Sequence, residues 1–174
     1  MTHPLHLFKF CPKCGSPHFV ENNEKSKRCE DCSFVYYFNP SASTVALIVN
    51  NDGELLVATR AKEPVKGTLD LPGGFVDLNE TIEETVVREI KEEANLNVNR
   101  VEYLFSETNI YPYSGFDVHT VDFVFRCFVD DISPMKAADD VSKLEFIKIE
   151  NLNPELFGLT SIQNIIRKIK TTKI

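Results

Sequence analysis

The stretch that decides the fold runs from Gly74 to Leu96 and reads GFVDLNETIEETVVREIKEEANL. Residues 80–94 contain no glycine or proline, which predicts a helix with Asn79 as its N-cap. At about 100° per residue, the aliphatic side chains gather on one face of that helix. This face consists of Ile82, Val86, Val87, Ile90 and Ala94. We expect it to pack against a sheet.

Three glutamates follow the edge of this apolar face. Glu89 lies three residues before Glu92 and four before Glu93, so their carboxylates are neighbours on the helix. Each like-charge pair costs a few tenths of a kcal/mol. A divalent cation would remove this repulsion, because carboxylate oxygens are preferred ligands of Mg²⁺, Mn²⁺ and Ca²⁺. The alternative is a solvated acidic face, and the helix alone does not decide between the two.

Four cysteines form two pairs ahead of this helix. Cys11 and Cys14 have two residues between them, as do Cys29 and Cys32. Two such thiolate pairs can complete a tetrahedron around one Zn²⁺, which predicts a closed, structural zinc site. Two disulfides are the alternative, which a cytosolic protein rarely forms. The fifth cysteine, Cys127, lies in an alternating strand pattern and is expected in the core.

The remaining pattern predicts an α/β protein with a mixed sheet packed between helices. Apolar and β-branched runs predict strands at 43–49, 54–60, 98–105, 116–129 and 144–149, with a closing helix at 160–170. The turn signal NNDG at 50–53 joins the first two strands as a hairpin. We expect a zinc ribbon over residues 1–38 and one main domain over 39–174.

Composition limits the function classes. The chain has 174 residues and a net charge of −7, which argues against a nucleic-acid partner. No apolar run approaches the roughly 18 residues of a membrane span, and the start lacks a secretory pattern, so we expect a cytoplasmic protein without a membrane partner. The sequence is compatible with a monomer or a homodimer.

The stretch at 74–96 resembles the signature of the Nudix hydrolases, G-x5-E-x7-R-E-U-x-E-E-x-G-U, where U is aliphatic. Gly74, Glu80, Arg88 and the three edge glutamates match. Asn95 stands where the family has glycine. A glycine there ends the helix in a left-handed conformation, and asparagine is the next most tolerant residue.

The resemblance implies an α/β/α sandwich that binds Mg²⁺ or Mn²⁺ together with a substrate diphosphate. The metal ligands that it implies are Glu89, Glu92, Glu93 and the backbone carbonyl of Gly74. Arg88 would orient a glutamate of this signature, and Glu80 would support its loop. The bare backbone of Gly73 and Gly74 lets phosphate and metal come close.

The reaction implied by the resemblance is attack of metal-activated water on one phosphorus of the diphosphate. The general base differs between family members. It is either a glutamate of the signature, here Glu89, or an acidic residue of a later loop, here Asp139 or Asp140. The alternative for the two aspartates is a solvated turn.

A four-cysteine ribbon ahead of such a domain is similar to the NADH pyrophosphatase group. That group carries the motif Ser-Gln-Pro-Trp-Pro-Phe-Pro-x-Ser, which residues 106–115 only echo, and this chain has no tryptophan. The expected substrate is therefore NADH, ADP-ribose or a similar nucleoside diphosphate derivative. Tyr111 and Tyr113 could stack on its base, as could Tyr36–Phe38, although core or ribbon packing is the commoner role of such residues.

Two other functions compete with hydrolysis. A nucleotide-sensing or nucleic-acid-associated binding module could use the same fold, but such sensors often lose acidic residues of the signature, and here every one is kept. An isomerase on this fold would need further catalytic residues that the sequence does not reveal.

Overall fold

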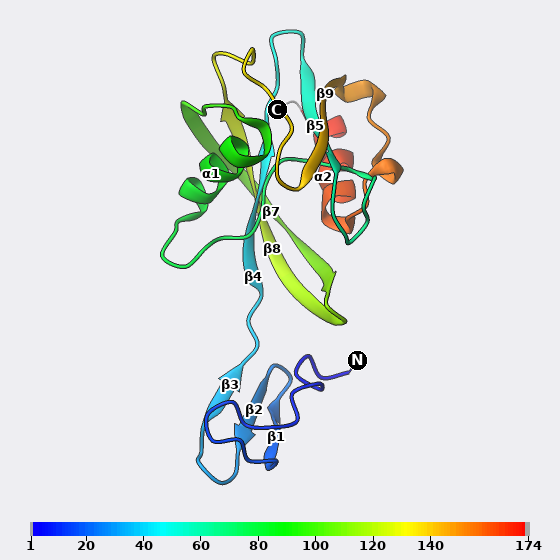
Figure 1. Ribbon diagram of the computed structural model, residues 1–174. Coiled ribbons are helices and arrows are strands. Elements are labelled where there is room, and N and C mark those ends of the chain that lie inside the picture. The colour runs from blue at the N-terminus through cyan, green and yellow to red at the C-terminus, as the bar shows by residue number, and fades with distance from the viewer. Residues whose placement is uncertain (1, 173–174) are drawn as a thin grey trace. The chain divides into compact units, whose positions relative to one another are not determined.

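Two compact units make up the protein in the computed structural model, which describes residues 2–172. One unit ends at Pro40 and the other begins at Ser41 (Figure 1). The first unit contains one antiparallel sheet, in the order β1 (Phe19–Asn23), β2 (Ser26–Cys29) and β3 (Val35–Tyr37). Its buried apolar cluster consists of Cys11, Phe19 and Cys29, so two of the three side chains are thiols. So small a core predicts that the metal stabilises this unit.

Two three-stranded sheets form the second unit. The first sheet has the order β4 (Ser41–Leu47), β8 (Phe116–Phe128) and β7 (Arg100–Tyr113), with β4 parallel to β8 and β7 antiparallel to it. The second is antiparallel, in the order β6 (Leu69–Asp70), β5 (Glu54–Arg60) and β9 (Val141–Lys148). The helical elements are α1 (Ile82–Ala94), α2 (Thr160–Thr171) and the single turns η1 (Ile149–Asn151) and η2 (Pro154–Leu156).

Separate cores cover the two faces of the sheets, because neighbouring residues of a strand point to opposite sides. Val45 and Leu47 belong to the core that contains the apolar side of α2. Ala46 and Ile48 belong to the core that contains the apolar side of α1. The expected sandwich of a mixed sheet between helices is therefore confirmed (Figure 1). Val87, expected on the packed face of its helix, is 38% exposed because it lies at the margin of the apolar sector.

Helix α1 begins at Ile82, two residues later than predicted. Thr81, not Asn79, is its N-cap, because Thr81 and Glu84 form a capping box. The Glu84 N–H donates to the Thr81 hydroxyl at 3.2 Å, and the Thr81 N–H donates to the Glu84 carboxylate at 2.9 Å. The helix ends as expected, with Asn95 in the left-handed region at φ 55°.

Strands β7 and β8 form a long hairpin. Strand β7 continues to Tyr113, well beyond the predicted end at residue 105, and the turn follows at Ser114 and Gly115. Tyr111 and Tyr113 therefore lie in a strand, on one side of it, with their rings 6.4 Å apart. The parallel pairing on the other side of β8 sets Ser43 opposite Asp122.

None of the helices within the described residues combines the length and the apolar character that a membrane span requires.

Candidate active site and metal centres

The four paired cysteines converge on one point of the first unit. Their sulfur atoms all lie within 4.8 Å of one another, with 3.8 Å between Cys11 and Cys32 and 3.6 Å between Cys14 and Cys29. A disulfide would bring two sulfurs to about 2.05 Å, so these thiols are unbonded. Zn–S bonds of about 2.3 Å in a tetrahedron separate the sulfurs by about 3.8 Å. The cluster thus has the dimensions of a structural Zn²⁺ site.

The glutamates of α1 differ in burial although they lie close in sequence. The side chain of Glu89 is 13% exposed and that of Glu92 is 47% exposed, whereas Glu93 is 7% exposed. Burial raises the pKa of Glu93 to about 8, although the Gly73 N–H opposes the shift. Burial also raises the pKa of Glu89, against the opposing effect of Arg88. Both carboxylates would therefore bind a proton or a cation readily.

Arg88 connects the helix to the loop before it. Its Nε and Nη2 donate to the two oxygens of Glu80, each at 2.9 Å, and its Nη1 donates to Glu89 at 2.8 Å. The same Nη1 reaches Glu92 at 3.2 Å. The hydrogen bond from Arg88 lowers the pKa of Glu80 to about 2, and the Thr85 hydroxyl adds to the shift. Arg88 is therefore placed to fix the orientation of Glu89.

The loop ahead of the helix approaches the carboxylates through two glycines. The Gly73 N–H donates to Glu93 at 3.0 Å, and the Gly74 carbonyl accepts the Thr44 N–H at 2.8 Å. A Cβ on Gly74 would lie 2.4 Å from a carboxylate oxygen of Glu89. A Cβ on Gly73, at φ 148°, would lie 2.1 Å from the Thr44 carbonyl oxygen. Only glycine therefore allows this backbone to lie against the carboxylates.

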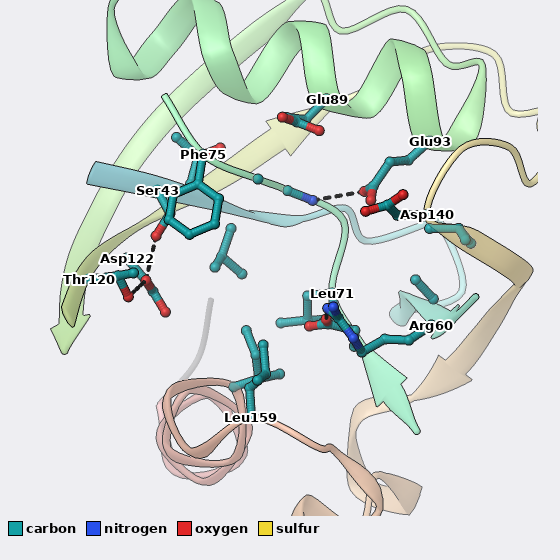
Figure 2. A pocket seen from close by; sticks show the side chains of 18 of the residues that line it. Ser43, Arg60, Leu71, Phe75, Glu89, Glu93, Thr120, Asp122, Asp140 and Leu159 are labelled. Atoms are coloured by element: carbon teal, nitrogen blue, oxygen red, sulfur yellow. Dashed lines mark hydrogen bonds and ion pairs between the residues drawn. The ribbon is translucent and has the colours of Figure 1, made fainter. Parts of the chain in front are cut away.

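These groups line one cavity of about 330 Å³. Its charged residues are Asp70, Asp77, Glu89, Glu92, Glu93, Asp122, Asp139 and Asp140, with Arg60 and Arg88. Figure 2 shows Glu89 and Glu93 pointing into it from α1, and Asp140 beside Glu93. Carboxylates outnumber arginines so strongly that an anionic diphosphate could not bind here without cations.

The loop before β9 brings Asp139 and Asp140 to this cavity. The Lys62 ammonium contacts both carboxylates, at 3.1 Å for Asp139. The backbone of this loop is also held, because the Ala61 N–H donates to the Asp140 carbonyl at 2.7 Å. The structure therefore brings both later-loop candidates for the general base to the same cavity as Glu89.

Arg60 and Tyr111 occupy another part of the cavity. The Arg60 Nη1 pairs with Asp70 at 2.5 Å, and its Nη2 donates to the Tyr111 hydroxyl at 3.2 Å. Both charged side chains of this pair are largely buried. The Tyr111 ring packs edge-to-face on Phe75 at 5.6 Å. Tyr113 is 63% exposed and is not among the residues that line the cavity.

Several residues of the cavity were not anticipated from the sequence: Ser43, Arg60, Asp70, Phe75, Asn109, Thr120 and Asp122. Asp122 carried a signal, since it alternates with Val124 on a core-facing side of a strand, where a charge is costly. No signal in the sequence identifies the Arg60–Asp70 pair, because it joins two strands whose pairing the local pattern does not reveal.

The donor set fits a hard divalent cation. Glu89, Glu93 and the Gly73–Gly74 backbone offer oxygen atoms around a buried, negatively charged space. Within residues 2–172 no three carboxylates lie as close together as the four sulfurs do. A cation here would therefore take further ligands from backbone, water or the diphosphate itself.

Comparisons with known proteins agree with this geometry. The chain is 28% identical over 145 residues to the "NAD-capped RNA hydrolase NudC" of Vibrio atlanticus, covering 82% of this chain and 53% of that protein. It is 38% identical over 119 residues to the "ADP-ribose pyrophosphatase" of Methanocaldococcus jannaschii, covering 67% and 66%. The chain thus spans about half the length of the first relative and about two thirds of the second.

Solved structures show the same fold. The NUDIX hydrolase of Nitrosomonas europaea superposes with a TM-score of 0.73 at 22% identity, over 95% of this chain and 92% of that one. The model of the NUDIX domain matches residues 39–168, three quarters of the sequence. The chain therefore belongs to the Nudix family.

Proposed function

We propose that the protein is a divalent-metal-dependent pyrophosphohydrolase. It cleaves a nucleoside diphosphate linked to another moiety, such as NADH or ADP-ribose, into a nucleoside monophosphate and a phosphorylated second product. The observation that carries the proposal is the pairing of Glu93 with the Gly73 N–H in a cavity where buried carboxylates outnumber cations. The names of the curated relatives support the same class of substrate.

The carboxylates of α1 would hold the metal and, through it, the diphosphate. We propose Glu89 and Glu93 as direct ligands, with Glu92 binding directly or through water and the Gly74 carbonyl as a further ligand. When bound, Mg²⁺ or Mn²⁺ lowers the pKa of its water and neutralises charge on the leaving phosphate. Arg88 keeps Glu89 in place, and the Gly73 N–H fixes one oxygen of Glu93.

A general base must take the proton of the attacking water. Glu89 is the first candidate, because burial raises its pKa toward the working range of a base. Asp140 is the second, and Lys62 holds it at the cavity. An Asp140→Asn variant that loses the low-pH limb of the pH–rate profile, on which the rate rises as the base deprotonates, would assign the role to Asp140. An unchanged profile would leave the role with Glu89.

The four-cysteine cluster would bind one structural Zn²⁺. All four positions of a tetrahedron are filled by protein sulfur, so this ion has no open position for catalysis. We propose that it folds the ribbon.

A substrate panel with Mg²⁺ tests the proposal: NADH, ADP-ribose, dinucleoside polyphosphates, sugar nucleotides and deoxynucleoside triphosphates. At least one diphosphate-linked nucleotide should be hydrolysed. Glu89→Gln and Glu93→Gln should each lower its turnover by about 100-fold or more. Glu83→Gln is the matched control, because Glu83 lies exposed in the first turn of the same helix.

Retention of near-normal turnover by Glu93→Gln would refute the metal assignment. Tight nucleotide binding without turnover of any substrate would instead favour the sensing module.

A further inference from the structure

Two buried polar side chains in the cavity have no part in the proposed chemistry. Asp122 is 5% exposed and Asn109 is 8% exposed, and both line the cavity. Figure 2 shows Asp122 and Thr120 at the side of the cavity away from Glu93 and Asp140. These side chains are therefore placed to contact a part of the substrate other than the diphosphate.

Hydrogen bonds hold Asp122 in one orientation and leave one oxygen available. The hydroxyls of Ser43 and Thr120 both donate to Oδ1, the latter at 2.6 Å. These two bonds use the acceptor sites of that oxygen. No side chain or backbone group within residues 2–172 donates to Oδ2, and no cation there pairs with the carboxylate. This oxygen is not one of the fully enclosed polar atoms of the described residues, so a ligand in the cavity that Asp122 lines can donate to it.

Asn109 provides a second, independent signal. Its strand position lies opposite Thr120, which places it next to the Asp122 cluster. Its side-chain amide makes no hydrogen bond to any described residue, although it is nine-tenths buried. Its amide atoms are not fully enclosed, and Asn109 lines the cavity, so the amide offers a donor and an acceptor to a ligand there.

Packing of the sheet does not explain why polar side chains lie at this end of it. The same side of the sheet continues beyond Ser43 and Asp122 with Val45 and Val124, which are buried in the apolar core. Polar residues therefore replace apolar ones where the sheet reaches the cavity. Phe75 also lines the cavity, and Figure 2 shows its ring beside Ser43.

We propose that Asp122 and Asn109 recognise the edge of a nucleobase that carries an exocyclic amino group. The Asp122 Oδ2 accepts an N–H of that amino group, and the Asn109 amide donates to a ring nitrogen beside it. A carbonyl at the same position would turn its lone pairs toward the carboxylate and be rejected. This inference rests on the proposed function, since it assigns one end of the substrate in the same cavity.

Binding of product nucleotides tests the inference without turnover. Titration calorimetry in Mg²⁺ would compare AMP with purine riboside 5′-monophosphate, which lacks only the amino group. The wild-type protein should bind AMP about 10- to 100-fold more tightly, the range for a hydrogen bond to a charged group. Asp122→Asn should reduce this ratio to within about threefold, because a neutral amide replaces the carboxylate.

Asp52→Asn is the matched control, because it removes one carboxylate from an exposed turn outside the cavity and should keep the wild-type ratio. Equal affinity of wild-type protein for the two nucleotides would overturn the inference, whether or not Asp122→Asn folds. An unchanged ratio in a folded Asp122→Asn would overturn it as well. Failure of the proposed function would give a different result. No substrate of the panel would then be hydrolysed, whatever the ratio of the affinities for AMP and purine riboside 5′-monophosphate.

Discussion

Replacing Glu93 by glutamine should stabilise the metal-free protein while abolishing its hydrolysis. Glu93 is buried among carboxylates, and burial raises its pKa to about 8 from an ordinary value of 4.5. Glutamine has almost the same shape, carries no charge at any pH, and keeps an oxygen that can accept the Gly73 N–H. The substitution therefore removes the electrostatic cost and leaves the loop contact in place.

The size and sign of the effect follow from the pKa shift. Below pH 4.5 Glu93 is neutral in folded and unfolded protein alike, so wild type and variant should be equally stable. Between pH 4.5 and pH 8 the folded state retains a proton that the unfolded chain has lost, so each pH unit lowers the free energy of unfolding of the wild type by up to about 1.4 kcal/mol. At pH 8 the accumulated advantage of Glu93→Gln has a ceiling of about 4 kcal/mol.

Urea denaturation followed by circular dichroism measures this difference at pH 4.5 and at pH 8. Divalent cations should be removed with a resin. A strong soluble chelator is unsuitable, because it would also extract zinc from the cysteine cluster. Added Mg²⁺ should stabilise wild type but not the variant. Glu92→Gln is the control, because its side chain is 47% exposed and should change stability little. A Glu93→Gln protein that is no more stable than wild type at pH 8 would refute the argument.

Three further outcomes are expected. Metal analysis should find about one zinc per chain, lost in Cys29→Ser and kept in Cys127→Ser, because only the first removes a ligand of the four-sulfur cluster. In urea titrations, lowering the pH from 4.5 through 2 should destabilise the wild type more than Glu80→Gln. Arg88 holds the pKa of Glu80 at about 2, so the stabilisation from the ionised Glu80 carboxylate is lost as this group becomes protonated. Gly73→Ala should lower the melting temperature and abolish hydrolysis, since its Cβ would meet backbone at 2.1 Å, whereas Gly53→Ala meets nothing within 4 Å and should keep activity.

Local patterns predicted the parts of the fold that depend on neighbouring residues. The period of α1, its end at Asn95 and the turn at NNDG are encoded within a few positions, and the structure contains all three. The predicted hairpin is wrong, because β4 and β5 belong to different sheets and only an isolated bridge between Val49 and Leu55 joins the two sides of the turn. The predicted start of α1 is wrong because the Thr81–Glu84 capping box, and not Asn79, begins the helix. A capping box satisfies two backbone N–H groups, whereas a lone N-cap side chain satisfies one.

Contacts between distant segments could not be predicted from the same patterns. The cavity joins Arg60 to Asp70 across two strands and Ser43 to Asp122 across a parallel pair. Neither contact follows from spacing, because pairing of strands is decided by packing of the whole sheet. Tyr113 illustrates the same limit, since the length of β7 carries it away from the cavity that Tyr111 lines.

The central claim is that the cavity hydrolyses a diphosphate with the help of the α1 carboxylates. Incubation of ADP-ribose and Mg²⁺ with the protein in oxygen-18 water, followed by mass spectrometry, tests it most directly. We expect AMP and ribose 5-phosphate in equal amounts, with one oxygen-18 atom on the phosphate of one of them, and no turnover by Glu93→Gln. Label in a product of any other bond cleavage, or equal labelling by the Glu93→Gln protein, would contradict it.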